Sequence, residues 1–185
     1  MKKPLIIIGI VIIAIVLYFW SSYNGLVTLR ENATAQWQQV ETSYQRRFDL
    51  IPNLVESVKG ILTQEQTIFT ALADARTRYA GAQTVPDKAL AAGQLETSLG
   101  RLLAVIENYP TLKSSENVRD LMTQLEGTEN RISTERGRFN DTIKIYQVAI
   151  QRFPRAIVAS LFGFEKMEYF EAQAGAETAP KVDLQ

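Results

Sequence analysis

Two short stretches of the chain carry the polar side chains that are candidates for chemistry. They are Arg46, Arg47, Asp49 and Asn53 in the first half, and Glu129, Arg136 and Asn140 in the second. If the segments that carry them pack antiparallel, these groups meet as one buried polar layer. Such a layer destabilises a fold unless its charges are paired, yet it fixes the register between helices. We interpret it as structural, with a ligand or ion site and a catalytic carboxylate pair as alternatives.

The absence of cysteine and histidine from all 185 residues excludes several classes of enzyme. No thiolate nucleophile, cysteine-type zinc site, imidazole base or Ser-His-Asp triad can form. The sequence also lacks a glycine-rich loop of the kind that cradles phosphate. A hydrolase that uses Glu126 or Glu129 is the enzymatic alternative that survives. We expect no enzymatic activity, no cofactor and no bound metal.

An uncharged apolar run, LIIIGIVIIAIVLYFW, fills residues 5–20. Extended to residues 4–23, a helix of this length covers about 30 Å, the thickness of the bilayer's hydrocarbon core. A cleaved signal peptide is the alternative, but the sequence FWSSY at 19–23 is a poor cleavage site. Lys2 and Lys3 precede the run, so we expect a retained anchor with its N-terminus in the cytoplasm.

The chain as a whole has 20 basic and 20 acidic side chains. Without Lys2 and Lys3 the remainder is mildly acidic, and it has no basic run longer than Arg46-Arg47. A nucleic-acid partner is therefore not expected. We expect a membrane and envelope proteins as partners, and self-association stays open.

The remainder of the chain has the apolar spacing of amphipathic helices. Steps of three or four residues run through 33–62 and 68–79, then through 87–108 and 115–152. No period-two alternation indicates a sheet. The sequence predicts an all-α protein, a transmembrane helix followed by an antiparallel up-and-down bundle. It has four helices if the chain breaks at Pro52, or three if it only kinks there.

Aromatic residues concentrate after the last long helix, in a segment that Gly163 interrupts. The candidate contacts with a partner or with the membrane interface are Phe153, Phe162, Phe164, Tyr169 and Phe170. Helix count decides where they lie, because a fourth helix returns Phe164 toward the membrane and a third does not. We expect an anchor at 1–22, the bundle at 23–170 and a disordered tail at 171–185.

The sequence resembles the LemA family of bacterial membrane-anchored helical proteins over nearly its whole length. The stretches that carry the resemblance are YNGLV (23–27), RRFDLIPNLVE (46–56), ENYPTLK (107–113), LEGTENRI (125–132) and the Phe153-Pro154 pair with LFGF (161–164). The family usually has Tyr-Asn twice on the last long helix, where this chain has Phe139-Asn140 and Tyr146-Gln147. The resemblance implies a bacterial envelope protein with a four-helix up-and-down bundle and no established enzymatic activity.

Together these observations predict a protein whose function is contact. We expect a non-enzymatic interaction or scaffold protein in the bacterial inner membrane, with its bundle on the periplasmic or extracellular side. The alternative is an envelope hydrolase or ion-binding protein that uses carboxylates in the middle of the bundle.

Overall fold

The computed structural model describes residues 2–171, without the side chains of residues 2, 3 and 5, and every regular element in that range is helical. Of the tail expected at 171–185, residues 172–185 lie outside the described residues. The all-α prediction is confirmed. The helices are α1 (Lys2–Val58), α2 (Gln66–Gly81), α3 (Val85–Glu107), α4 (Pro110–Lys113), α5 (Glu116–Gln151) and α6 (Arg155–Leu161).

Helix α1 passes through Pro52 without a break and ends at Val58. The structure takes one part from each alternative at Pro52. Helix α1 does not break there, as the three-helix alternative expected. The described chain nevertheless has four long helices, because the break comes later, at residues 59–65. Leu62 explains why the sequence pattern hid this break. Its side chain is fully buried although it lies in the turn, so the apolar stripe runs on beyond the helix.

The N-terminal part of α1 is the one described helix that is long and apolar enough to cross a membrane. Its isoleucine and valine side chains from Ile6 to Val16 are exposed to more than half of their area. A face of this kind is stable in lipid and costly in water. The helix therefore has the length and composition of a membrane anchor.

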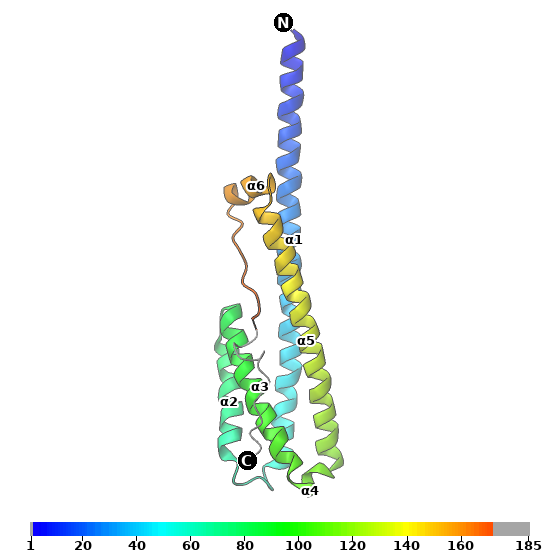
Figure 1. The fold of residues 1–185 in the computed structure, drawn as a ribbon, viewed down its shortest axis with the longest axis vertical. Helices are drawn as coiled ribbons and strands as arrows, with labels where there is room; N and C mark the ends of the chain where they lie inside the picture. Colours follow the sequence, from blue (N-terminus) through cyan, green and yellow to red (C-terminus); the bar gives the residue numbers. More distant parts are fainter. Residues whose placement is uncertain (1, 172–185) are drawn as a thin grey trace, which may run out of the picture. The chain divides into compact units, whose positions relative to one another are not determined.

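The junction between α2 and α3 follows from local chemistry. Helix α2 ends at Gly81, and the Thr84 hydroxyl then caps α3 by accepting a hydrogen bond from the Asp87 amide at 3.2 Å. Pro86 stands in the first turn of α3, where its missing N–H has no intrahelical role. This short connection sets α2 and α3 antiparallel (Figure 1).

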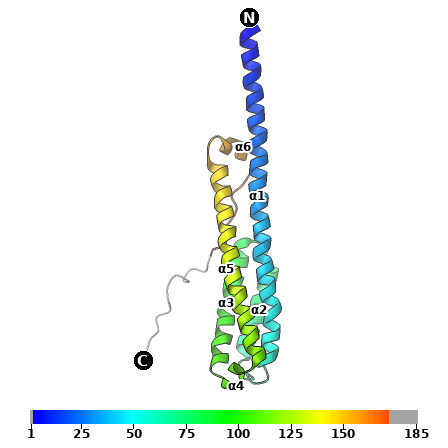
Figure 2. The same ribbon diagram turned by 90° about the vertical axis from the view of Figure 1, so that its right-hand side faces the viewer.

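The described chain divides into two compact units. The first holds residues up to 39 and 137–168, and the second holds 40–136 with residues from 169 onward. In the second unit, the end of α1 and the start of α5 join α2 and α3 as four antiparallel helices (Figure 2). Its core contains stacked and edge-on aromatic rings, with Tyr79 centred 5.0 Å from Tyr44 and 4.9 Å from Phe48.

The first unit pairs the N-terminal part of α1 with the C-terminal part of α5 and with α6. Leu26 on α1, Tyr146 and Ile150 on α5, and Val158 and Ala159 on α6 belong to one buried cluster. The chain turns at Gly163, whose φ of 69° favours glycine, and then runs on without helix.

The Tyr23 ring on α1 contacts the segment that follows α6 and so shows where this segment lies along α1. It lies 4.9 Å from the ring of Phe162 and 5.7 Å from that of Phe164. Tyr23 follows the apolar run of α1 by three residues. The aromatic segment has therefore returned to the membrane end of α1, as the four-helix alternative predicts.

The position of Pro52 inside α1 leads to a stability prediction. A proline in a helix interior removes one hydrogen bond and costs roughly 3 kcal/mol relative to alanine. We expect Pro52→Ala to raise the free energy of unfolding of the full chain in detergent by about 1–3 kcal/mol, measured by urea titration with circular dichroism. Asn53→Ala, at an exposed neighbouring position, is the control and should gain less than about 1 kcal/mol. A neutral or destabilising Pro52→Ala would contradict a continuous helix.

Candidate functional site

Arg47 of α1 is the one arginine in the described residues that is almost completely buried, with 1% of its side chain exposed. Its Nη2 pairs with Oε2 of Glu129, and its Nε donates to the Thr128 hydroxyl at 3.3 Å. Its Nη1 lies 3.9 Å from Oε1 of Glu96, within ion-pair distance but without a hydrogen bond. A buried guanidinium is thus held by groups from α3 and α5.

Glu96 on α3 connects Arg47 to two further side chains. Its Oε1 accepts a hydrogen bond from the Tyr44 hydroxyl at 3.1 Å and lies 3.4 Å from Nη1 of Arg136. The Arg136 guanidinium in turn lies over the Phe170 ring, 4.4 Å from its centroid, in a cation–π contact. We call Tyr44, Arg47, Glu96, Glu129 and Arg136 the Arg47 network.

Burial dominates the electrostatics of the network. Desolvation raises the pKa of the Glu96 carboxyl, and the nearby Arg136 guanidinium opposes this shift. Desolvation also raises the pKa of the Tyr44 hydroxyl, and the Glu96 charge adds to that shift. Tyr44 therefore stays protonated and acts as a hydrogen-bond donor.

The network is balanced in charge, with two arginines against two glutamates. Its groups are engaged with one another, so the arrangement favours fixed register between α1, α3 and α5 over acid–base chemistry. A cavity of about 790 Å³ between α3 and α5 borders it, lined in part by Arg47, Glu96 and Glu129. Among the described residues, no group of three or more acidic side chains is placed to hold a metal ion.

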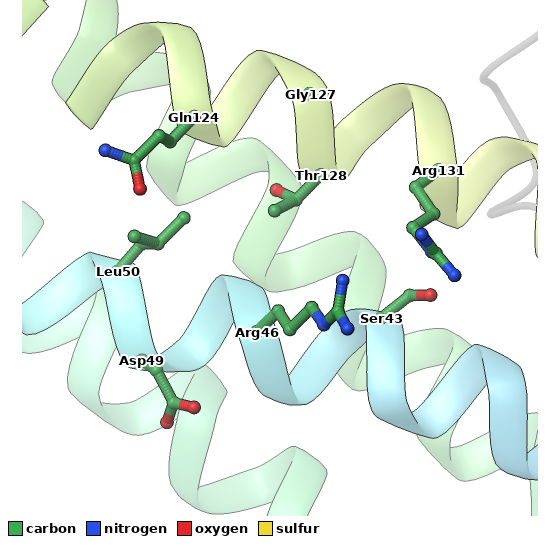
Figure 3. A pocket seen from close by; sticks show the side chains of 8 residues that line it. All are labelled: Ser43, Arg46, Asp49, Leu50, Gln124, Gly127, Thr128 and Arg131. Carbon is green, nitrogen blue, oxygen red and sulfur yellow. The ribbon is translucent and has the colours of Figure 1, made fainter. Parts of the chain in front are cut away.

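A second polar feature lies between α1 and α5 in the same unit. It is a groove of about 480 Å³, which we call the arginine groove, lined by Ser43, Arg46, Asp49, Leu50, Gln124, Gly127, Thr128 and Arg131. Figure 3 shows Arg46 and Arg131 extending toward each other from the two helices. The Asp49 carboxylate points away from α5 and accepts a hydrogen bond from the Gln45 amide at 2.8 Å.

The two guanidinium groups of the arginine groove have no carboxylate partner within the described part of the chain. Gly127 adds no side chain to the wall. The space beside it is open, since a Cβ built there would meet nothing within 4 Å. The groove is therefore open and positively charged.

The structure does not bring the residues of the predicted polar layer together in one place. Arg47, Glu129 and Arg136 meet in the Arg47 network. Arg46 and Asp49 line the arginine groove. Asn53 is exposed and donates to the Asp49 carbonyl at 3.4 Å, and Asn140 is half-buried in the first unit.

The five predicted aromatic contacts also separate. Phe153 and Phe162 are exposed, Phe164 packs partly buried against the core of the first unit, and Tyr169 is half-buried. Phe170 is buried, because its ring stacks on Tyr44 at 6.1 Å and receives Arg136. It belongs to the core of the second unit and offers no exposed surface.

Sequence reasoning missed Tyr44 and Glu96. Tyr44 falls in the apolar stripe of α1, so its spacing indicates only a core position. Glu96 is one carboxylate among many on amphipathic helices, and no feature of its own segment distinguishes it. The signal would have been a charge at a half-buried position beside the buried Leu95 and Leu99.

Comparison with known proteins agrees with the fold and the motifs. The model of the LemA family matches residues 36–184. The chain belongs to the LemA family. The matched residues include every member of the Arg47 network and every residue that lines the arginine groove.

The chain is also similar to proteins named for the magnetosome. The magnetosome protein MamQ of Magnetospirillum gryphiswaldense is 32% identical over 182 residues, which cover 84% of this chain and 67% of that protein. Magnetosome proteins MamQ 1 and MamQ 2 of Paramagnetospirillum magneticum are each 30% identical, over 90% of this chain and 71% of theirs.

The pairing of Arg47 with Glu129 leads to a prediction. Glu129→Gln leaves a buried cation with only Glu96 as its carboxylate partner, so we expect the free energy of unfolding to fall by about 2 kcal/mol. This is less than the roughly 3–5 kcal/mol for breaking a fully buried pair, because Glu129 is about half exposed. Urea titration of the full chain in detergent measures it.

Glu126→Gln is the matched control for that measurement. Glu126 is an exposed carboxylate on the same helix and forms no ion pair with Arg47, so its loss should change stability by less than about 0.5 kcal/mol. Equal effects of the two variants would contradict a structural role for the Arg47–Glu129 pair.

Proposed function

We propose that this protein is a non-enzymatic, membrane-anchored interaction or scaffold protein, and that the arginine groove is a contact site for a protein partner. The observation that carries the proposal is the convergence of Arg46 and Arg131 on one open groove without a carboxylate partner. The LemA family and an apolar N-terminal helix support the membrane-anchored part of it.

Charge and geometry define the ligand that suits the arginine groove. Two guanidinium groups that face each other repel, and an anion between them removes that repulsion. Arginine binds carboxylates through two parallel hydrogen bonds, which gives both strength and orientation. The Ser43 and Thr128 hydroxyls and the Leu50 side chain complete a wall that fits an acidic segment of a protein.

The contrast with the Arg47 network supports contact over catalysis. Arg47 and Arg136 are paired internally with Glu96 and Glu129, so they stabilise the bundle. Arg46 and Arg131 are available for intermolecular contact. The names of the relatives state an association with the magnetosome and no reaction.

Site-specific photo-crosslinking in intact cells tests the contact site. A photoreactive amino acid at Gln124, in the wall of the groove, should form a discrete crosslinked product with a second protein. We expect Arg46→Glu with Arg131→Glu to reduce that product at least tenfold, because the charge of the groove is reversed.

Arg76→Glu with Arg101→Glu is the matched control for the crosslinking experiment. Both arginines are exposed in the second unit, outside the arginine groove, and the change in net charge is the same. A crosslinked product that survives reversal of Arg46 and Arg131, or that the control abolishes equally, would refute the groove as a contact site.

We further propose that the protein lies in the bacterial inner membrane with its bundle on the periplasmic or extracellular side. Lys2 and Lys3 before the apolar run support this orientation. The natural chain has no cysteine, so Arg101→Cys gives it a single thiol. We expect a membrane-impermeant maleimide to label this thiol in intact cells. Labelling only after lysis would show that the bundle lies in the cytoplasm and would refute this orientation.

A specific observation also favours the alternative of a hydrolase or an ion-binding protein. Glu96 and Glu129 border the cavity between α3 and α5, and burial raises the pKa of the Glu96 carboxyl, the direction that a general acid requires. If this alternative holds, Glu129→Gln abolishes an activity or a metal-dependent rise in melting temperature. Stability loss alone, without either effect, supports the structural assignment.

A further inference from the structure

The first unit exposes a set of large apolar side chains at the end of α5 and on α6. We call this set the α6 shelf, and it consists of Ile145, Val148, Phe153, Ile157, Leu161 and Phe162. Phe153 is 78% exposed and Leu161 is 68% exposed. Six large apolar side chains exposed within 18 residues are costly in water, so the shelf indicates that lipid or a partner covers it.

Contacts with α1 show where the shelf lies. The Phe162 ring touches Tyr23, and Val158 and Ala159 on the opposite face of α6 are buried in the cluster with Leu26. The apolar run of α1 ends at Trp20, so Tyr23 and Leu26 lie roughly 5 and 9 Å farther along the helix. That is the depth at which lipid headgroups meet water.

A groove of about 460 Å³ lies between this part of α1 and the shelf. Its walls extend from Tyr18 to Leu29 on α1, and Val148 and Phe153 are among the residues on the other side. The groove therefore spans the end of the apolar run. Its lining is apolar except for the Tyr18 hydroxyl and the side chains of Arg152 and Arg155.

Those two arginines are available to a ligand. Within the described residues, neither the Arg152 nor the Arg155 side chain forms an ion pair or a hydrogen bond. Nη2 of Arg155 comes within 3.7 Å of the point where a Cβ would stand on Gly25. The Arg155 guanidinium therefore lies against α1, two residues beyond Tyr23.

We propose that this groove binds the phosphate of an anionic phospholipid from the bilayer that anchors α1. Arg152 and Arg155 hold the headgroup, and the α6 shelf packs on the acyl chains. Guanidinium groups match phosphate oxygens in charge and geometry, and the apolar walls match the hydrocarbon that follows. Continuity with the apolar run of α1 selects lipid over a soluble partner. The proposal is independent of the arginine groove, which lies in the other unit.

Lipid retention by the purified full chain tests the proposal without any protein partner. Native mass spectrometry in detergent counts the phosphatidylglycerol molecules that remain bound. A single arginine near an anionic surface contributes roughly a fivefold factor in affinity, so we expect Arg152→Gln with Arg155→Gln to weaken retention about 30-fold. Phosphatidylcholine should be retained more weakly than phosphatidylglycerol by the natural chain.

The matched control is Arg76→Gln with Arg101→Gln, which removes the same charge from exposed sites in the second unit. The control should retain phosphatidylglycerol as the natural chain does. Equal retention by the Arg152 and Arg155 variant, or equal loss in the control, would overturn the proposal. Displacement of the lipid by millimolar inorganic phosphate would also overturn it, because the site would then recognise a soluble anion.

The depth of the shelf gives a second readout that does not depend on the arginines. A spin label on Leu161→Cys in a phosphatidylglycerol nanodisc should be more accessible to oxygen than to a water-soluble nickel chelate. A label on Arg101→Cys should show the opposite. If the Leu161 label behaves as the Arg101 label does, the shelf does not face lipid and the proposal fails.

Discussion

The buried guanidinium of Arg47 is the constraint on which the helical bundle depends. An arginine loses several kcal/mol of hydration in an interior, and only well-placed carboxylates and hydroxyls offset this loss. Glu129 and Thr128 on α5 supply these groups, and Glu96 on α3 adds a second negative charge. A shift of α5 by one turn, about 5.4 Å, would separate the cation from Glu129 and Thr128 and leave it only Glu96. The network therefore selects one register among the several that the apolar seams alone allow.

Periodicity predicted the helices closely, because each has one buried face. The expected helices at 87–108 and 115–152 correspond to α3 and α5 within two residues. Pro52 misled the interpretation, since proline is both a helix breaker and tolerated where neighbouring packing compensates. Ile51 and Leu54 on either side of it are buried, and this packing holds α1 together. The true break contains Gly60, which the stripe through Leu62 obscured.

The site was less predictable than the fold, because pairing between distant segments leaves no mark in one sequence. Arg47 and Glu129 were recognisable as charges at seam positions, and the structure joins them. Their third partner, Glu96, lies on α3, which carries no polar motif. Phe170 is a comparable case. Its residue type and position after α6 favour an exposed contact, whereas Tyr44 and Arg136 enclose its ring.

Each of the two units is stabilised internally by a different kind of interaction. In the first unit, the Tyr146 hydroxyl donates to the Glu165 carbonyl at 2.8 Å, and the Gln147 amide donates to the Met167 carbonyl at 2.6 Å. These bonds fix the segment that follows α6, and Phe139, without a hydroxyl, packs on Trp37 instead at 5.1 Å. This chain thus departs from the family's usual Tyr-Asn pairs at two positions. Phe139 replaces a tyrosine and makes an apolar ring contact, and Gln147 replaces an asparagine and still donates to a carbonyl.

Because uncharged side chains donate these hydrogen bonds to backbone carbonyls, and the other contacts are aromatic, the stability of the first unit depends little on salt. The stability of the second unit depends on the charges of the Arg47 network. The effects of substitutions at sites that share no contacts add nearly independently. Substitutions at the arginine groove and at the α6 shelf should therefore alter the proposed protein contact and the proposed lipid contact separately.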